Sequence, residues 1–121
     1  MIDIKLENDI RLKIDIVEYD EVLPSIKINI DIKTQSLKGG FDINFNFWSR
    51  CEDFDGFIAE DLEFIKDLID NKRICFTNDS LVVAPIFSNP NIKFDCVVEI
   101  KITQESKSIL RNKFLDFDRW W

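Results

Sequence analysis

Isoleucine at every second position constrains the fold of this chain more than any other feature. Ile26, Ile28, Ile30 and Ile32 alternate with polar residues. Successive side chains of a β-strand point to opposite faces, so this spacing places all four isoleucines on one face. The stretch therefore predicts a strand with one buried face. The same alternation in IRLKIDI, residues 10–16, predicts a second one.

Further alternation predicts antiparallel strands around these two. After the turn-forming SLKGG, residues 41–47 alternate Phe or Ile with Asp or Asn and are expected to pair with the isoleucine strand. The apolar phase shifts by one position at Val17, which indicates a bulge or the strand's end. Towards the C-terminus, RICFT, LVVAPIF and residues 92–102 alternate in the same way. Pro85 should confine the second of these to a sheet edge or a bulge.

One segment between the strands has the period of a helix instead. Ile58, Leu62, Ile65 and Ile69 recur at helical spacing, which predicts one amphipathic helix over about residues 56–71. The tail is ambiguous, because Leu110 and Phe114 fit a helix whereas alternate residues from Leu115 fit a strand. We favour a final strand with an irregular end.

Together these elements predict one α+β domain, residues 1–121. It consists of a largely antiparallel, twisted β-sheet with one amphipathic α-helix packed on one face. Strands are expected over about residues 2–48 and 73–118, on either side of the helix.

The acidity of the chain is concentrated in residues 52–70. This stretch holds eight of the 23 carboxylates and one base, so its net charge of −7 equals that of the whole chain. On a helical wheel, four of the acids group opposite the apolar row and form an acidic stripe: Glu60, Glu63, Asp67 and Asp70. Asp53 joins the stripe if the helix reaches back to it, whereas Asp61 falls at the rim of the core.

The residue types argue against several kinds of chemistry. The chain has no histidine, which removes Ser-His-Asp and Cys-His catalysis. Its three cysteines are widely spaced and favour reduced, buried thiols: Cys51, Cys75 and Cys96. An EF-hand loop aligned on Gly56 would need ligands at Cys51 and Leu62, so that reading fails. We expect no cofactor and no metal, with a loose magnesium site at Asp53 and Asp55 as the alternative.

A basic protein is the partner that the acidic stretch favours. Its charge repels phosphate, so nucleic acid is not expected to bind, but it complements the basic groove of a nuclease or another cationic protein. A solvated helix face is the competing interpretation. The tryptophan pair at the chain end fits an interface anchor or the core. The predicted partner-binding residues are Asp53, Asp55, Glu60, Glu63, Asp67, Asp70, Trp120 and Trp121.

Location in the cell is predicted from what the sequence lacks. No apolar run approaches the roughly 20 residues that span a bilayer, and MIDIKLENDI has neither the basic start nor the apolar stretch of a signal peptide. We therefore expect a cytoplasmic protein without a membrane partner.

The order of elements resembles the small immunity proteins of bacterial polymorphic and contact-dependent toxin systems, in particular the WapI-associated type. The resemblance covers most of residues 22–104 and rests on KINIDIK, GGFDINFNFW, FIAEDLEFIKDLI, RICF and FDCVVEIKI. It implies a non-enzymatic protein that binds a cognate toxin domain, often a nuclease, and blocks its active site. The alternatives are a small carboxylate-dependent enzyme centred on Asp61 and a homo-oligomeric structural subunit.

Overall fold

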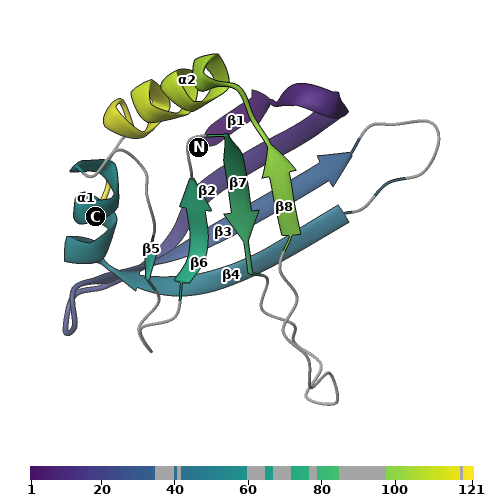
Figure 1. Ribbon diagram of the computed structural model, residues 1–121. Helices are drawn as coiled ribbons and strands as arrows, with labels where there is room; N and C mark the ends of the chain where they lie inside the picture. The colour runs from purple at the N-terminus through teal and green to yellow at the C-terminus, as the bar shows by residue number, and fades with distance from the viewer. Residues whose placement is uncertain are drawn as a thin grey trace.

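The computed structural model of the protein describes residues 1–34, 40, 42–59, 65–66, 72–76, 79–84, 98–117 and 119–121 (Figure 1). Within them the chain forms two four-stranded antiparallel sheets and two α-helices. The predicted α+β class, dominated by antiparallel strands with a helix packed on the sheet, is confirmed. The second helix lies in the C-terminal segment, where we expected a strand.

The first sheet is built from the N-terminal half of the chain. Its spatial order is β1 (Ile2–Lys5), β2 (Ile10–Asp20), β3 (Ser25–Thr34) and β4 (Asp42–Arg50), and the 3-10 helix η1 (Glu7–Asp9) joins β1 to β2. The four alternating isoleucines of β3 are all fully buried. β3 pairs with β4 as predicted, with Ile30 opposite Phe45. The irregularity predicted at Val17 is also present, because the register of β2 against β3 shifts between Ile16 and Glu18.

The second sheet comes from the C-terminal half. Its spatial order is β5 (Ile65–Lys66), β6 (Lys72–Phe76), β7 (Ser80–Val83) and β8 (Val98–Lys101). The strands predicted in RICFT and LVVAPIF correspond to β6 and β7. β8 is the described part of the strand predicted over residues 92–102. Pro85 and its predicted edge position lie outside the described residues.

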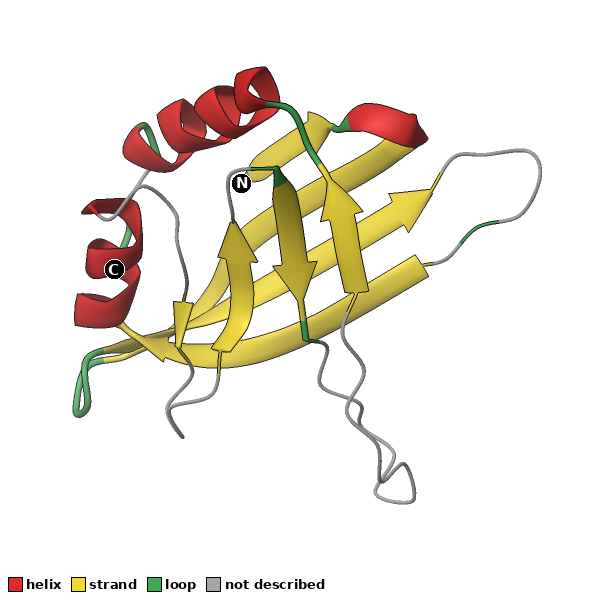
Figure 2. Ribbon diagram, in the orientation of Figure 1, coloured by secondary structure: helices red, strands yellow, loops and turns green. Residues whose placement is uncertain are grey.

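The two sheets lie face to face, and both helices lie to one side of them (Figure 2). Apolar side chains from both sheets and from α1 (Cys51–Ala59) and α2 (Gln104–Leu115) form one buried cluster. Phe57 of α1 connects its parts, because its ring lies 6.1 Å from that of Phe76 in β6 and 5.3 Å from that of Phe114 in α2. The helices therefore cover one end of the core between the sheets.

The helix predicted from residue 56 starts earlier, at Cys51. The Cys51 N–H donates to the carbonyl of Pro24 at 3.0 Å, so the first turn is held by the β2–β3 connection. Gly56, which we placed at the start, lies inside α1 on an open side where a Cβ would meet no atom within 4 Å. Phe54 and Phe57 are the buried residues that fix the helix on the core.

The predicted end of that helix, at residue 71, is wrong. Ile65–Lys66 forms β5, and Ile65 pairs with Ile74 of β6. The apolar row from Ile58 to Ile69 fits a helical period, but a β-branched residue with an adjacent strand gains backbone pairing and packing in the sheet. Tertiary pairing therefore overrides the local period. Within the described residues, neither α-helix is long and apolar enough to cross a membrane.

The final strand, predicted to reach residue 118, is also wrong, because α2 occupies Gln104–Leu115. Its N-cap is Thr103, whose side-chain oxygen accepts the Ser106 N–H at 3.2 Å. The buried residues Leu110 and Phe114 are four positions apart, on one face of the helix. These two residues are the ones that fitted a helix in the sequence of the tail. The N-cap at Thr103 favours that helix over the strand.

Glu7 of η1 ties the start of α2 to the first sheet. Its Oε1 accepts hydrogen bonds from the hydroxyls of Ser106, at 2.5 Å, and Thr103, at 2.7 Å. Burial alone would raise the pKa of Glu7, but these hydrogen bonds outweigh it and hold the pKa below its ordinary value of 4.5. The carboxylate also lies at the positive end of the α2 dipole. Residues nearly 100 positions apart are thus joined by one charged group.

Glu7→Gln is expected to lower the free energy of unfolding at pH 7 by about 1–2 kcal/mol, because the charged acceptor for both hydroxyls is lost. A carboxyl whose folded pKa is lowered stabilises the fold above its unfolded pKa, and this contribution disappears as pH falls through the folded pKa. The difference between wild type and variant should therefore shrink below about pH 4. Urea unfolding at several pH values measures it.

Glu105→Gln is the matched control, since Glu105 is an exposed acid in the first turn of α2. It tests the helix dipole without the hydroxyl contacts and should cost less than about 0.5 kcal/mol. Equal losses for the two variants, or a Glu7→Gln loss that does not change with pH, would contradict the proposed role of Glu7.

Candidate functional site

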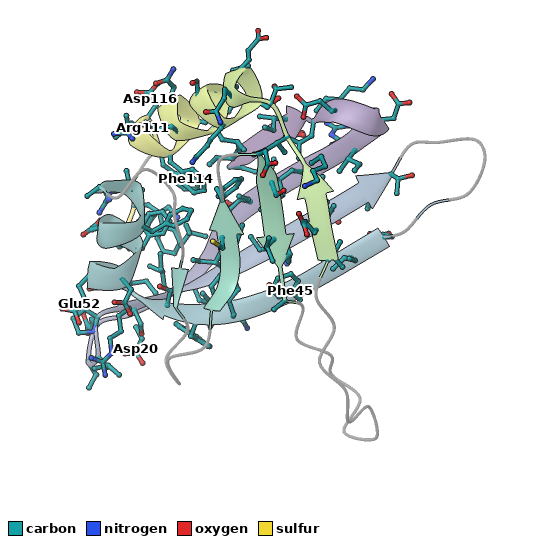
Figure 3. All side chains as sticks on the ribbon, in the orientation of Figure 1. Asp20, Phe45, Glu52, Arg111, Phe114 and Asp116 are labelled. Atoms are coloured by element: carbon teal, nitrogen blue, oxygen red, sulfur yellow. The ribbon has the colours of Figure 1, made fainter. Side chains whose placement is uncertain are left out.

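Six acids gather where the β2–β3 connection meets the start of α1, and we call this set the acidic end: Glu18, Asp20, Glu21, Glu52, Asp53 and Asp55. Figure 3 shows Asp20 and Glu52 at the same end of the molecule, and the backbone hydrogen bond between Cys51 and Pro24 joins the two segments. Glu52 and Asp53 lie in the first turn of α1, where the helix dipole favours negative charge.

Three bases partly neutralise the acidic end among the described residues. Lys27 lies 3.5 Å from Glu18, and Arg50 lies 3.7 Å from Glu52. Arg119 pairs with Asp55. All three pairs are solvent-accessible, so each contributes little to stability. Six acids against three bases leave a net negative charge.

Asp55, a predicted partner-binding residue, is engaged with the C-terminal tail. Its partner Arg119 places its guanidinium over the rings of Phe54 and Trp121, 5.7 Å from each ring centre. Asp55 thus has an internal ionic partner, unlike Asp53, the other predicted acid that the structure describes. The magnesium alternative built on these two acids finds no support, because no group of three or more potential ligands occurs among the described residues.

The two terminal tryptophans, predicted together, have different environments. Trp121 is half-buried, and its ring packs 6.0 Å from Phe54 and 6.1 Å from Phe117. Trp120 is 56% exposed, and its ring is nearly perpendicular to that of Trp121, with 5.9 Å between the ring centres. The core interpretation therefore describes Trp121, and only Trp120 is left available to a partner.

The other predicted acids, Glu60, Glu63, Asp67 and Asp70, lie outside the described residues, as does Asp61. The continuous stripe that we predicted for them is wrong as a helical feature, because β5 interrupts the segment at Ile65. Sequence analysis did not name Glu18 or Glu52 as partner-binding residues, and it missed Asp20 and Glu21 of the acidic end. Both follow the phase shift at Val17, which is the signal that could have marked this segment as leaving the core face.

A second polar cluster, also missed, lies on the outer face of β7 and β8. Ser80 donates to Glu99 Oε1 at 2.9 Å, and Lys101 Nζ donates to Ser80 Oγ at 3.3 Å and to Glu99 Oε1 at 3.1 Å. The alternation of β8 places Glu99 and Lys101 on one face, but Ser80 joins them only through the register of β7 against β8.

Electrostatics decides what this cluster can do. A serine beside a lysine acts as a nucleophile only if the lysine is neutral and accepts the proton. Here the hydrogen bond to Glu99 and the charge of Asp79 raise the pKa of Lys101. Hydrogen bonds from Ser80 and Lys101 lower the pKa of Glu99, so both charges persist at neutral pH. The cluster is an ion-paired network in which Lys101 stays protonated and cannot serve as the base.

The structure describes two cysteines, Cys51 and Cys75, and Cys51 is a free thiol. Both are half-buried rather than buried as predicted, and Cys96 lies outside the described residues. Burial and then the charge of Asp55 raise the pKa of the Cys51 thiol. The thiol form is unreactive as a nucleophile, in agreement with the absence of an activating histidine.

A hollow of about 230 Å³ lies on the outer face of β1 and β2. It is lined by Asp3, Ile4, Lys5 and Arg11. Arg11 binds Asp3 through two hydrogen bonds of 2.7 and 2.6 Å, which hold the pKa of the carboxyl below its ordinary value. Lys5, the second base of the lining, lies 3.3 Å from Asp9, so both bases are already paired with acids and the hollow offers no strong site for an ion.

The chain matches no model of a known protein family, and it matches no curated protein and no solved structure.

Proposed function

We propose that this protein is an immunity protein: a non-enzymatic, cytoplasmic inhibitor that binds a cognate bacterial toxin domain and covers its active site. The observation that carries the proposal is the acidic end, where the β2–β3 connection and the first turns of α1 bring six acids together. The resemblance of the strand motifs to those of immunity proteins of the WapI-associated type supports it.

Electrostatics explains why a nuclease toxin is the proposed target. A nuclease must bind phosphates and therefore presents a groove rich in Lys and Arg. An acidic surface speeds association with such a groove and selects it against neutral or acidic surfaces. The inhibitor would then act by steric and electrostatic occlusion of the nucleic acid.

The first experiment identifies the partner. Tagged protein is used to retain binding proteins from the native cell lysate at low and moderate salt, and each protein released by salt is expressed alone to test its toxicity. We expect a basic protein that arrests growth and that co-expression of this protein neutralises. Retention of no toxic protein would reject the immunity proposal.

A charge-reversal set then tests the acidic end on the partner that was found. Asp20→Lys, Glu21→Lys and Glu52→Lys combined are expected to weaken binding at low salt by about tenfold or more, with the difference shrinking at high salt because of screening. The matched control changes three exposed acids elsewhere by the same total charge: Asp42→Lys, Glu105→Lys and Asp116→Lys. Equal weakening by the two sets would mean that net charge alone steers binding.

A further inference from the structure

The β2–β3 hairpin ends in apolar side chains that the core does not use. Val22 is 92% exposed and Leu23 is 46% exposed, and Val17 and Tyr19 are exposed as well. We call these four residues the hairpin tip. In Figure 1 the hairpin end projects beyond the first sheet, next to α1. Half of the exposed large apolar residues in the described part of the chain therefore lie in one stretch of seven residues, 17–23.

The register shift in β2 accounts for the exposure of Val17. Up to Ile16 the even-numbered residues of β2 face the core, and Ile16 pairs with Ile28. The shift between Ile16 and Glu18 leaves Val17 without a partner residue in β3. Such a bulge bends the strand beyond it. Tyr19 lies opposite the fully buried Ile26 and is nevertheless exposed. The tip has therefore left the core while keeping its apolar side chains.

Local hydrogen bonds hold the tip in shape. The carboxylate of Asp20 accepts the Val22 N–H at 2.9 Å, and the Ser25 hydroxyl donates to the Leu23 carbonyl at 2.7 Å. The hydrogen bond from Cys51 to the Pro24 carbonyl connects the tip to α1. A connection ordered in advance loses less conformational entropy when it binds, which favours its use as an anchor.

The charges around the tip indicate its occupant. Asp20 and Glu21 directly precede Val22 and Leu23 in the chain, and the hydrogen bond from Cys51 to the Pro24 carbonyl brings the first turn of α1, with Glu52 and Asp53, to the same connection. A second copy of this protein would bring the same acids face to face, and an anionic membrane surface would be repelled. A cationic protein with an apolar pocket complements both the charge and the exposed side chains.

We propose that the hairpin tip is the apolar anchor by which this protein docks on a cationic protein, with Val22 and Leu23 entering an apolar pocket of the partner. This inference rests on the proposed function and moves the centre of the interface from the predicted acidic stripe to the β2–β3 connection. Interfaces commonly have an apolar centre within a polar rim, and here the acids would form the rim.

Photocrosslinking in the native cells tests the anchor and captures the partner in the same step. A photoreactive amino acid replaces Val22 in one variant, Glu52 in a second and Ile109 of α2 in a third. Ile109 is the matched control, because it is 44% exposed and lies away from the hairpin tip. We expect a basic protein to crosslink at position 22 and not at position 109.

Binding of that purified protein is then measured with Val22→Ser and Leu23→Ser combined, against Ile109→Ser. The first is expected to raise Kd by about tenfold or more at both low and high salt, because an apolar contact is not screened. Ile109→Ser should leave Kd unchanged. Thermal unfolding of the free variants confirms that the fold is intact.

The outcomes separate this inference from the proposed function. A basic toxic protein that crosslinks at position 52 but not at 22, or a Kd that the serine variants do not change, would overturn the anchor and leave the immunity function standing. A covalent dimer of this chain at position 22 would also overturn the anchor. If no basic protein crosslinks at any position, both proposals fail.

Discussion

Phe114→Ala is expected to lower the free energy of unfolding by about 3–5 kcal/mol. Phe114 is 2% exposed, and its ring makes edge contacts with Phe57, at 5.3 Å between ring centres, and with Phe54, at 6.1 Å. Its removal opens a cavity where the aromatic ring of α2 meets the two rings of α1. The loss combines the transfer free energy of the ring with the cost of that cavity. Urea unfolding followed by circular dichroism measures it.

Leu115→Ala is the control for Phe114→Ala, because Leu115 is the next residue and is 58% exposed. It should change the free energy of unfolding by no more than about 0.5 kcal/mol, as is usual for surface positions. The pair also distinguishes the helix from the strand that we predicted, in which Leu115, and not Phe114, belongs to the apolar face. A larger loss for Leu115→Ala than for Phe114→Ala would contradict the helix.

The strands of the first sheet could be predicted because the burial of one face of each strand appears in the sequence itself as an alternation of apolar and polar residues. In β3 the alternation of Ile with polar residues leaves no other face for the core, and the bulge at Val17 was visible as a change of phase. The signal is strong where burial on one face and exposure on the other coincide with a period of two. No information from distant parts of the chain was needed.

The helices were placed wrongly because distant contacts decide them. Ile65 satisfies the helical spacing, but the strand formed with Ile74 takes it into the second sheet. The start of α2 depends on Thr103 and on Glu7, which is separated from Thr103 by most of the chain. Local periodicity cannot express a partner of that kind.

The candidate site also has a part that the sequence predicts and a part that depends on distant contacts. The excess of acids in residues 52–70 is a property of the sequence, and Asp53 is one of the predicted acids that belong to the acidic end. The pairing of Asp55 with Arg119 could not be predicted, because it requires the tail to return to α1. The approach of the β2–β3 connection to the start of α1, which brings Asp20 near Glu52, likewise depends on the sheet topology.

Ile30→Ala is expected to cost about 2–5 kcal/mol, and Ile30→Val about 0.5–1.5 kcal/mol. Ile30 is fully buried in β3, an inner strand of the first sheet, and belongs to the apolar cluster that the second sheet also lines. Shortening it by one methylene leaves a small void, while alanine removes most of the contacts between the two sheets at that point. The graded pair measures how tightly the sheets pack, by urea unfolding at constant pH.

Lys33→Ala in the same strand separates packing from strand propensity. Its side chain is 51% exposed and lies 3.7 Å from that of Asp31, which is 14% exposed, so its removal costs a partly buried ion pair worth about 1 kcal/mol. Alanine is a poor strand former, so both variants carry that cost and only Ile30→Ala adds the cavity. If the two losses were equal, the isoleucine row of β3 would not face a packed second sheet. A loss of unfolding free energy that is much larger for Ile30→Ala than for Lys33→Ala would place the core between the sheets. That packing holds the β2–β3 hairpin and α1 in their positions at the acidic end.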